Sequence, residues 1–188
     1  IYGLGSPEEY EKRVVLLAVG EEHDRDLVLR KLVDIQYARN DTLLGRGRFR
    51  VKGDVVEVQP AYMESAYRIS FFGDEVEQIT HFDPLTGEVY GKLAHLALFP
   101  ATQYVTSKPS IERASEQIRH ELEEQVKMFD ASGKMLEAHR IRQRTEYDLE
   151  MMQELGFCSG IENYSRHLDG RAPGTAPHTL LDFFPSDF

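Results

Sequence analysis

The spacing of apolar residues changes from a helical period to an alternating one near residue 48. Over residues 24–37, apolar side chains recur about one helical turn apart with charged residues between them, which predicts an amphipathic helix. From Arg48 onward apolar and polar positions alternate, and Gly-Asp pairs follow Lys52 and Phe72. These pairs favour tight hairpin turns, because glycine adopts a positive φ without strain.

The alternation predicts an antiparallel meander. We expect strands at residues 48–52, 55–59, 67–72, 75–82 and 88–99, with a further turn at 83–87. The helix is expected to pack on one face of this sheet, because an antiparallel sheet commonly buries one face and leaves the other in water. Residues 11–101 are therefore predicted to form a compact α+β domain.

The second half of the chain predicts two long helices. Apolar residues recur at steps of three and four on both sides of the pair Ser132-Gly133, which is typical of an antiparallel αα-hairpin with a short loop. Residues 178–184 are mostly apolar and predict a buried strand. The positions expected along the two apolar stripes are Ile111, Ser115, Ile118, Leu122, Val126 and Phe129, then Met135, Ala138, Ile141, Thr145, Leu149 and Met152.

Charge and cysteine content narrow the function classes. The 188 residues carry a formal net charge of −10, so any DNA contact has to be local, because the overall field repels phosphates. The single cysteine, Cys158, excludes an internal disulfide, fits a reducing cytoplasm, and is expected to be a small buried thiol. No segment is apolar enough for a membrane span. The seven histidines lack metal-site spacing, so we expect surface or capping roles and no metal ion.

A cluster of basic residues lies at the start of the predicted sheet. Three of its cations alternate with Phe49 and Val51, so they should leave one face of a strand while the apolar pair faces the core. One interpretation is a docking surface for an acidic partner; another is a charged edge strand that resists aggregation. Because Phe49 should point inward, a protein partner is favoured over a nucleic acid. The cluster consists of Arg39, Arg46, Arg48, Arg50 and Lys52, with Asp41 as the acid among them.

A second polar cluster follows the helical hairpin. One hypothesis is a grip on a DNA strand, with arginine on phosphate and aromatic rings on bases. The alternative is a buried polar network that closes a helix end. The cluster consists of Arg144, Tyr147, Phe157, Glu162, Asn163, Tyr164, Ser165 and Arg166.

Four segments resemble the UvrB family of bacterial nucleotide excision repair. They are Ile1–Tyr10 (IYGLGSPEEY), Leu32–Asp41 (LVDIQYARND), Tyr147–Met152 (YDLEMM) and Gly156–His167 (GFCSGIENYSRH), in the order of that family. The resemblance covers nearly the whole chain and implies an internal piece of a longer protein. It implies that residues 1–10 are the end of a first helicase-like α/β domain and the linker after it. Residues 11–101 would then form the UvrA-interaction domain, and residues 102–188 would again belong to the helicase-like domain.

The resemblance also implies roles for individual residues. The positions that match the family's UvrA contacts are Arg39, Arg50, Lys52, Arg68 and Ser70. Lys52 stands where a relative carries Arg, and Ser70 where a relative carries Glu; lysine keeps the charge but loses the bidentate geometry of arginine. The positions that the resemblance implies as DNA contacts are Arg144, Glu162, Phe157 and Tyr104.

No phosphate-binding loop of the form G-x-x-x-x-G-K-[ST] occurs, so this chain is expected to hold no cofactor and to be catalytically inert. The resemblance implies that the parent protein binds ATP and Mg²⁺, receives damaged DNA from UvrA and positions it for UvrC. No membrane is expected to take part. One alternative is the UvrB-like module of the transcription–repair coupling translocase, where the same domain type recruits UvrA. Another is a structural insertion without a partner.

Overall fold

The computed structural model describes residues 2–102, 107–185 and 187. The chain divides into two compact units, one formed by residues 1–9 with 104–188 and the other by residues 10–103. Each unit has a hydrophobic core of its own, so each is described by itself.

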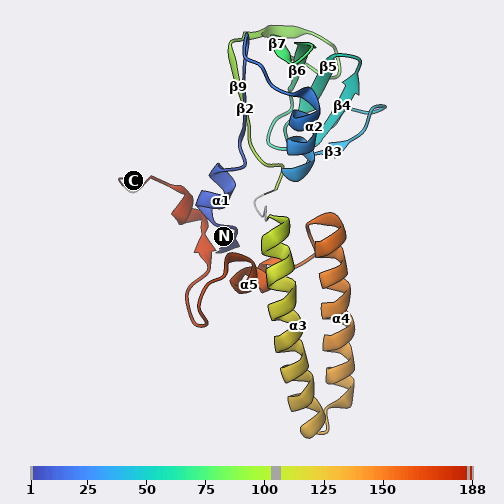
Figure 1. Cartoon of the computed structure of the whole chain (residues 1–188), viewed down its shortest axis with the longest axis vertical. Helices are drawn as coiled ribbons and strands as arrows, with labels where there is room; N and C mark the ends of the chain where they lie inside the picture. Colours follow the sequence, from blue (N-terminus) through green and yellow to red (C-terminus); the bar gives the residue numbers. More distant parts are fainter. Residues whose placement is uncertain (1, 103–106, 186, 188) are drawn as a thin grey trace. The chain divides into compact units, whose positions relative to one another are not determined.

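A six-stranded sheet dominates the unit of residues 10–103 (Figure 1). The strands follow one another in chain order, and every neighbouring pair is antiparallel except the first, which is parallel. Gly53 and Gly73 turn two of the hairpins with φ values of 60° and 63°, as the Gly-Asp pairs predict. The strands are β3 (Ala38–Arg39), β4 (Arg48–Lys52), β5 (Val55–Gln59), β6 (Ala66–Phe72), β7 (Glu75–Phe82) and β8 (Val89–Leu93).

The predicted amphipathic helix, α2 (Arg25–Asp34), packs on the sheet and fills the core. The side chain of Asp24 caps its first turn by accepting a hydrogen bond from the backbone N–H of Leu27 at 2.9 Å. The helix ends earlier than expected, because the chain turns at Gln36 with a φ of 70°. Buried residues in this core include Val28, Leu32, Phe49, Val56, Val58, Ile69 and Ile79.

The single strand expected over residues 88–99 is wrong. β8 ends at Leu93, and the chain then forms β9 (His95–Leu98), which pairs with β2 (Val15–Ala18) in a separate antiparallel ribbon. At the break, the carbonyl of Ala94 accepts a hydrogen bond from the N–H of Val19 at 2.9 Å instead of continuing the large sheet. β2 and the two-residue strand β3 are absent from the prediction.

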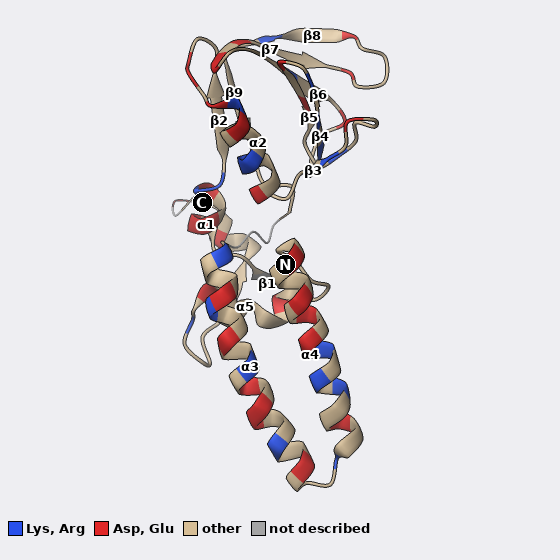
Figure 2. Cartoon of the chain, turned by 45° about the vertical axis from the view of Figure 1, so that its right-hand side comes forward, with Lys and Arg blue, Asp and Glu red and all other residues tan. Residues whose placement is uncertain are grey.

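The αα-hairpin is confirmed in the other unit. α3 (Lys108–Ala131) and α4 (Met135–Leu155) run antiparallel and carry both signs of charge along their lengths (Figure 2). Ser107 caps α3 by accepting a hydrogen bond from the N–H of Ser110 at 3.2 Å. The predicted stripes are largely buried or half-buried, but the prediction is wrong for Met135, which is 75% exposed where α4 begins.

The segment after α4 is more irregular than expected. α4 ends at the left-handed Gly156 and is followed by η1 (Ile161–Tyr164) and α5 (Ser165–Asp169). The buried strand expected over 178–184 is wrong: β10 (His178–Thr179) pairs with β1 (Tyr2–Leu4) and then gives way to the 3₁₀ turn η2 (Leu180–Phe183).

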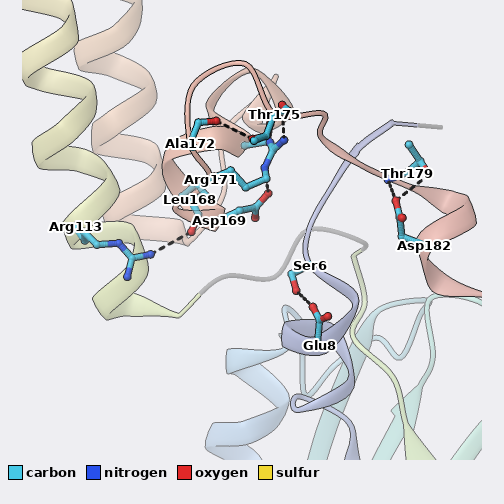
Figure 3. Close-up of polar contacts among 11 residues, drawn as sticks. Ser6, Glu8, Arg113, Leu168, Asp169, Arg171, Ala172, Thr175, Thr179 and Asp182 are labelled. Atoms are coloured by element: carbon cyan, nitrogen blue, oxygen red, sulfur yellow. Dashed lines mark hydrogen bonds and ion pairs between the residues drawn. The ribbon is translucent and has the colours of Figure 1, made fainter.

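A capping interaction explains why that strand stops. The backbone N–H and the hydroxyl of Thr179 both donate to the carboxylate of Asp182, at 2.6 and 2.9 Å (Figure 3). This arrangement begins a helical turn and leaves Leu181 70% exposed.

A short helix, α1 (Pro7–Glu11), follows β1. Among the described residues, no helix is both long enough and apolar enough to cross a membrane.

Candidate docking and nucleic-acid surfaces

The face of the sheet opposite α2 carries two arginines that share one buried carboxylate. Strand register places Arg50 on β4 opposite Glu57 on β5, and Glu57 opposite Arg68 on β6. Glu57 accepts hydrogen bonds from the Nε atoms of Arg50 at 2.5 Å and of Arg68 at 2.7 Å, one on each carboxylate oxygen. The three side chains therefore form a row across the strands.

Burial and hydrogen bonding act in opposite directions on Glu57, which is only 5% exposed. Burial raises the pKa of its carboxyl, but the hydrogen bonds and charges of Arg68 and Arg50 outweigh it, so the pKa lies below its ordinary value. The guanidinium of Arg68 also lies over the ring of Phe82, 4.5 Å from its centroid. Both arginines are thus held in fixed orientations, although their side chains still reach solvent.

Only part of the basic cluster is unpaired, because acids from outside residues 39–52 also reach it. Arg39 binds both oxygens of Asp41 through Nε and Nη2, and Arg46 pairs with Glu64. Within the part of the chain that the structure describes, Arg48 and Lys52 make no ion pair. These two cations therefore remain available to an incoming acidic group.

The candidate UvrA-contact residues are divided between two faces of the sheet. Phe49 is buried and Val51 is half-buried against the core, as predicted, so Arg50 and Lys52 leave the sheet on the opposite, outer face. Arg68 lies on this outer face too, as does Ser70, which is in register with Val55 and Gln78. Arg39 differs, because it is in register with Phe49 and leaves the edge of the sheet on the α2 side. The edge-strand alternative is wrong for Arg48 and Phe49, which pair with β3, but it stays open for the rest of β4, because β3 is only two residues long.

The second cluster contains a polar network that joins α4 to the segment after it. Arg144 donates from Nε to Asp148 at 2.9 Å and from Nη2 to the carbonyl of Ser159 at 3.0 Å. The hydroxyl of Tyr164 donates to the same oxygen of Asp148 at 2.9 Å. Burial is the main reason that the pKa of Tyr164 is raised to about 12, and the hydrogen bond to Asp148 acts in the same direction. Asp148 is buried, Tyr164 is half-buried and Arg144 is exposed, so the buried-network hypothesis describes the Tyr164–Asp148 contact but not Arg144.

The remaining members of the cluster are distributed differently. Phe157 is 42% exposed, and Glu162 is exposed as well. The guanidinium of Arg144 remains largely in solvent even though it binds Asp148. These three side chains are therefore accessible midway along α4, just after its end and in η1, respectively for Arg144, Phe157 and Glu162. Tyr104 lies outside the described residues.

Sequence reasoning did not predict how α5 is attached to α3. Arg166 and the Nε2 atom of His167 both contact one carboxylate oxygen of Glu121, at 2.7 and 2.6 Å. His167 is buried, so the expectation that every histidine lies at the surface or a cap is wrong for this one. These contacts direct Arg166 toward α3.

Arginines also hold the loop that follows α5. Arg113 donates to the carbonyl of Leu168 at 3.3 Å, and Arg171 binds Asp169 at 3.1 Å (Figure 3). Arg171 also donates to the hydroxyl of Ser165 at 2.9 Å. A polar segment bounded by glycines predicts such a loop, but it does not show which residues the loop binds.

The cysteine prediction is confirmed. Cys158 is buried in the core between the helices, and burial raises the pKa of its thiol to about 11. At neutral pH the thiol is protonated, so it acts as a small apolar side chain. In the ranges 2–102 and 107–185, no group of three or more His, Cys, Asp or Glu residues is placed to hold a metal ion.

The fold and its surfaces define a class: an α+β interaction domain with a polar sheet face, followed by a helical hairpin. Two family profiles match the same parts of the chain, one described as the UvrB interaction domain over residues 15–104 and one as the UvrB third helical domain over residues 109–170. The chain belongs to the UvrB family, which is part of the UvrABC excinuclease system of nucleotide excision repair.

Relatives named UvrABC system protein B match this chain over its whole length. The protein of Bacillus subtilis is 59% identical and that of Natranaerobius thermophilus 57% identical, each over 100% of this chain and 29% of the relative. The protein of Carboxydothermus hydrogenoformans is 56% identical over 100% of this chain and 28% of its own length. The chain thus spans less than a third of these curated relatives.

Proposed function

We propose that this chain is the part of a UvrB protein that docks onto UvrA and contributes to binding and verifying damaged DNA. Residues 11–101 are assigned to UvrA interaction, and residues 1–10 and 102–188 to the first helicase-like domain. In the longer protein, ATP and Mg²⁺ would be bound outside this chain, and UvrC would be engaged through the parent. The parent would act in the cytoplasm.

The single observation that supports docking is the row of Arg50, Glu57 and Arg68 on the outer sheet face. Two arginines fixed by one buried carboxylate present ordered donors, so little side-chain entropy is lost when a partner carboxylate binds them. Arg48 and Lys52 add unpaired charge on the same face of β4. A chain with a net charge of −10 that concentrates cations on one face is suited to a local acidic partner.

The helical unit supports the second role. Arg144 on α4, Phe157 just after α4 and Glu162 in η1 offer a guanidinium, an aromatic ring and a carboxylate. A single DNA strand is bound by this combination, with phosphate on the arginine and a base on the ring. Glu162 would shape the path of the strand, because a carboxylate repels phosphate.

The docking proposal predicts salt-sensitive binding to UvrA. Titration of purified UvrA into this chain by calorimetry should give a defined stoichiometry at low salt and weaker affinity at about 0.15 M salt, because screening shortens the reach of exposed charges to about 8 Å. A folded chain that gives no heat and no co-elution with UvrA at low salt would contradict the proposal.

The DNA role predicts that Phe157→Ala weakens binding to a fluorescent single-stranded oligonucleotide by about tenfold, because stacking one base on an aromatic ring contributes about 1–3 kcal/mol. Leu155→Ala is the matched control, because Leu155 is a similarly exposed apolar residue two positions earlier. Fluorescence anisotropy measures both affinities. Equal affinities for the two variants would exclude stacking on Phe157.

A further inference from the structure

A small apolar notch lies beside Arg39, on the α2 side of the sheet edge. Its volume is about 250 Å³, and its walls come from α2, β3 and β4. This is smaller than the roughly 300–1,000 Å³ of pockets that hold drug-sized ligands, so it suits one side chain rather than a small molecule. The lining residues are Leu29, Arg30, Val33, Asp34, Arg39 and Phe49.

The notch exists because the apolar face of α2 is wider than the core requires. Val28, Leu32 and Ile35 are buried in the core, but Leu29 is only half-buried and Val33 is 53% exposed. Leu29 and Val33 are four residues apart and so lie on the same side of the helix. Phe49, which is buried, closes the notch from β4. An exposed apolar wall of this kind is a favourable place for an apolar side chain of a partner.

The charges on the rim indicate what surrounds that side chain. Arg39 is fixed by Asp41, whose Oδ1 also accepts a hydrogen bond from the N–H of Val51 at 3.0 Å. Arg30 is exposed and makes no ion pair with any residue that the structure describes. Asp34 is the one carboxylate that lines the notch. Because Asp41 already occupies Arg39, the rim favours a partner carboxylate near Arg30 and disfavours one near Asp34.

We infer that the notch receives one apolar side chain from a UvrA segment that carries a carboxylate beside that side chain, placed to meet Arg30. This inference rests on the proposed docking function and extends it around the edge of the sheet. The cations on the outer face then attract the partner, and the notch fixes its position, because a buried apolar anchor contributes more to affinity than exposed charges do. Arg39 links the two parts, since it lines the notch and belongs to the predicted contact set.

Substitutions on α2 test the notch in UvrA titrations with the full chain. Val33→Asp and Arg30→Glu should each weaken UvrA binding by about tenfold, and Asp34→Asn should strengthen it by about twofold. Leu27→Asp and Lys31→Glu are matched controls on the same helix, because both residues are exposed and neither lines the notch. The controls should bind within about twofold of the unsubstituted chain. Circular dichroism checks that each variant is folded.

The possible outcomes separate this inference from the docking proposal. If the notch variants bind like their controls while Lys52→Glu weakens binding, the notch inference is overturned and docking on the outer face stands. If the unsubstituted chain does not bind UvrA, both fail. If sedimentation shows a dimer that Val33→Asp dissociates without affecting UvrA binding, the notch pairs copies of this chain and the inference is also overturned.

Discussion

Replacing Glu57 by glutamine is expected to lower the free energy of unfolding by about 2 kcal/mol. Removing one charge of a fully buried ion pair costs about 3–5 kcal/mol. Arg50 and Arg68 are partly exposed, so the expected loss is smaller. Glutamine keeps the shape and one acceptor, but it leaves two guanidinium groups without their shared counter-charge. Urea denaturation of the full chain measures the change.

Glu77→Gln is the matched control, because Glu77 is an exposed residue on β7 of the same sheet. It should change the free energy of unfolding by less than about 0.5 kcal/mol. The same loss in both variants would show that the ion pairs of Glu57 add nothing to stability. A loss confined to Glu57→Gln, together with weaker UvrA binding, would show that the row both stabilises the sheet and orients its arginines.

The pH dependence of stability should change in the same variant. Because the pKa of Glu57 is lower in the folded chain, its contribution is complete above the ordinary glutamate pKa. That contribution is lost as the pH falls through the lowered pKa, when the carboxyl becomes protonated. Glu57→Gln should therefore lose less stability than the unsubstituted chain over this acid range. If the free energy of unfolding falls equally with pH in the two proteins over this range, Glu57 is not responsible for the acid dependence.

One half of the Glu57 row was predictable from the sequence, and the other half was not. A two-residue turn at Gly53-Asp54 makes Lys52 the partner of Val55, and two residues further from the turn on each strand Arg50 is the partner of Glu57. The position of Arg68 depends on the loop over residues 60–65, whose course no periodicity specifies. Local patterns give the register of a tight hairpin, but not that of strands joined by a longer loop.

Non-local pairing also explains the wrong strand over residues 88–99. That segment has no turn signal, so its pattern gives no reason to divide it. It divides because β9 pairs with β2, about eighty residues earlier in the chain. The burial of His167 is a similar case, since it follows from the packing of α5 against Glu121 on α3. By contrast, the αα-hairpin depends on local periodicity and a glycine turn, and it was predicted correctly.

Reversing the charge at both Arg48 and Lys52 is expected to weaken UvrA binding by about 100-fold at low salt, with a smaller effect at high salt. Arg50→Glu would be a poorer test, because it places a carboxylate opposite Glu57 and so also disturbs the fold. Arg48 and Lys52 make no ion pair within the described ranges, and β4 keeps its buried Phe49 in the double variant. The loss can therefore be attributed to the docking surface.

Lys127→Glu with Arg140→Glu is the matched control for this double variant. It also replaces one lysine and one arginine at exposed positions, on α3 and α4, and it changes the net charge of −10 by the same amount. If affinity depends on local charge, the control should bind UvrA within about threefold of the unsubstituted chain. If both double variants lose affinity equally, the whole-chain charge governs association, and the outer sheet face has no special role. A loss confined to Arg48 and Lys52 places the contact on β4, since exposed charges on α3 and α4 then contribute nothing comparable.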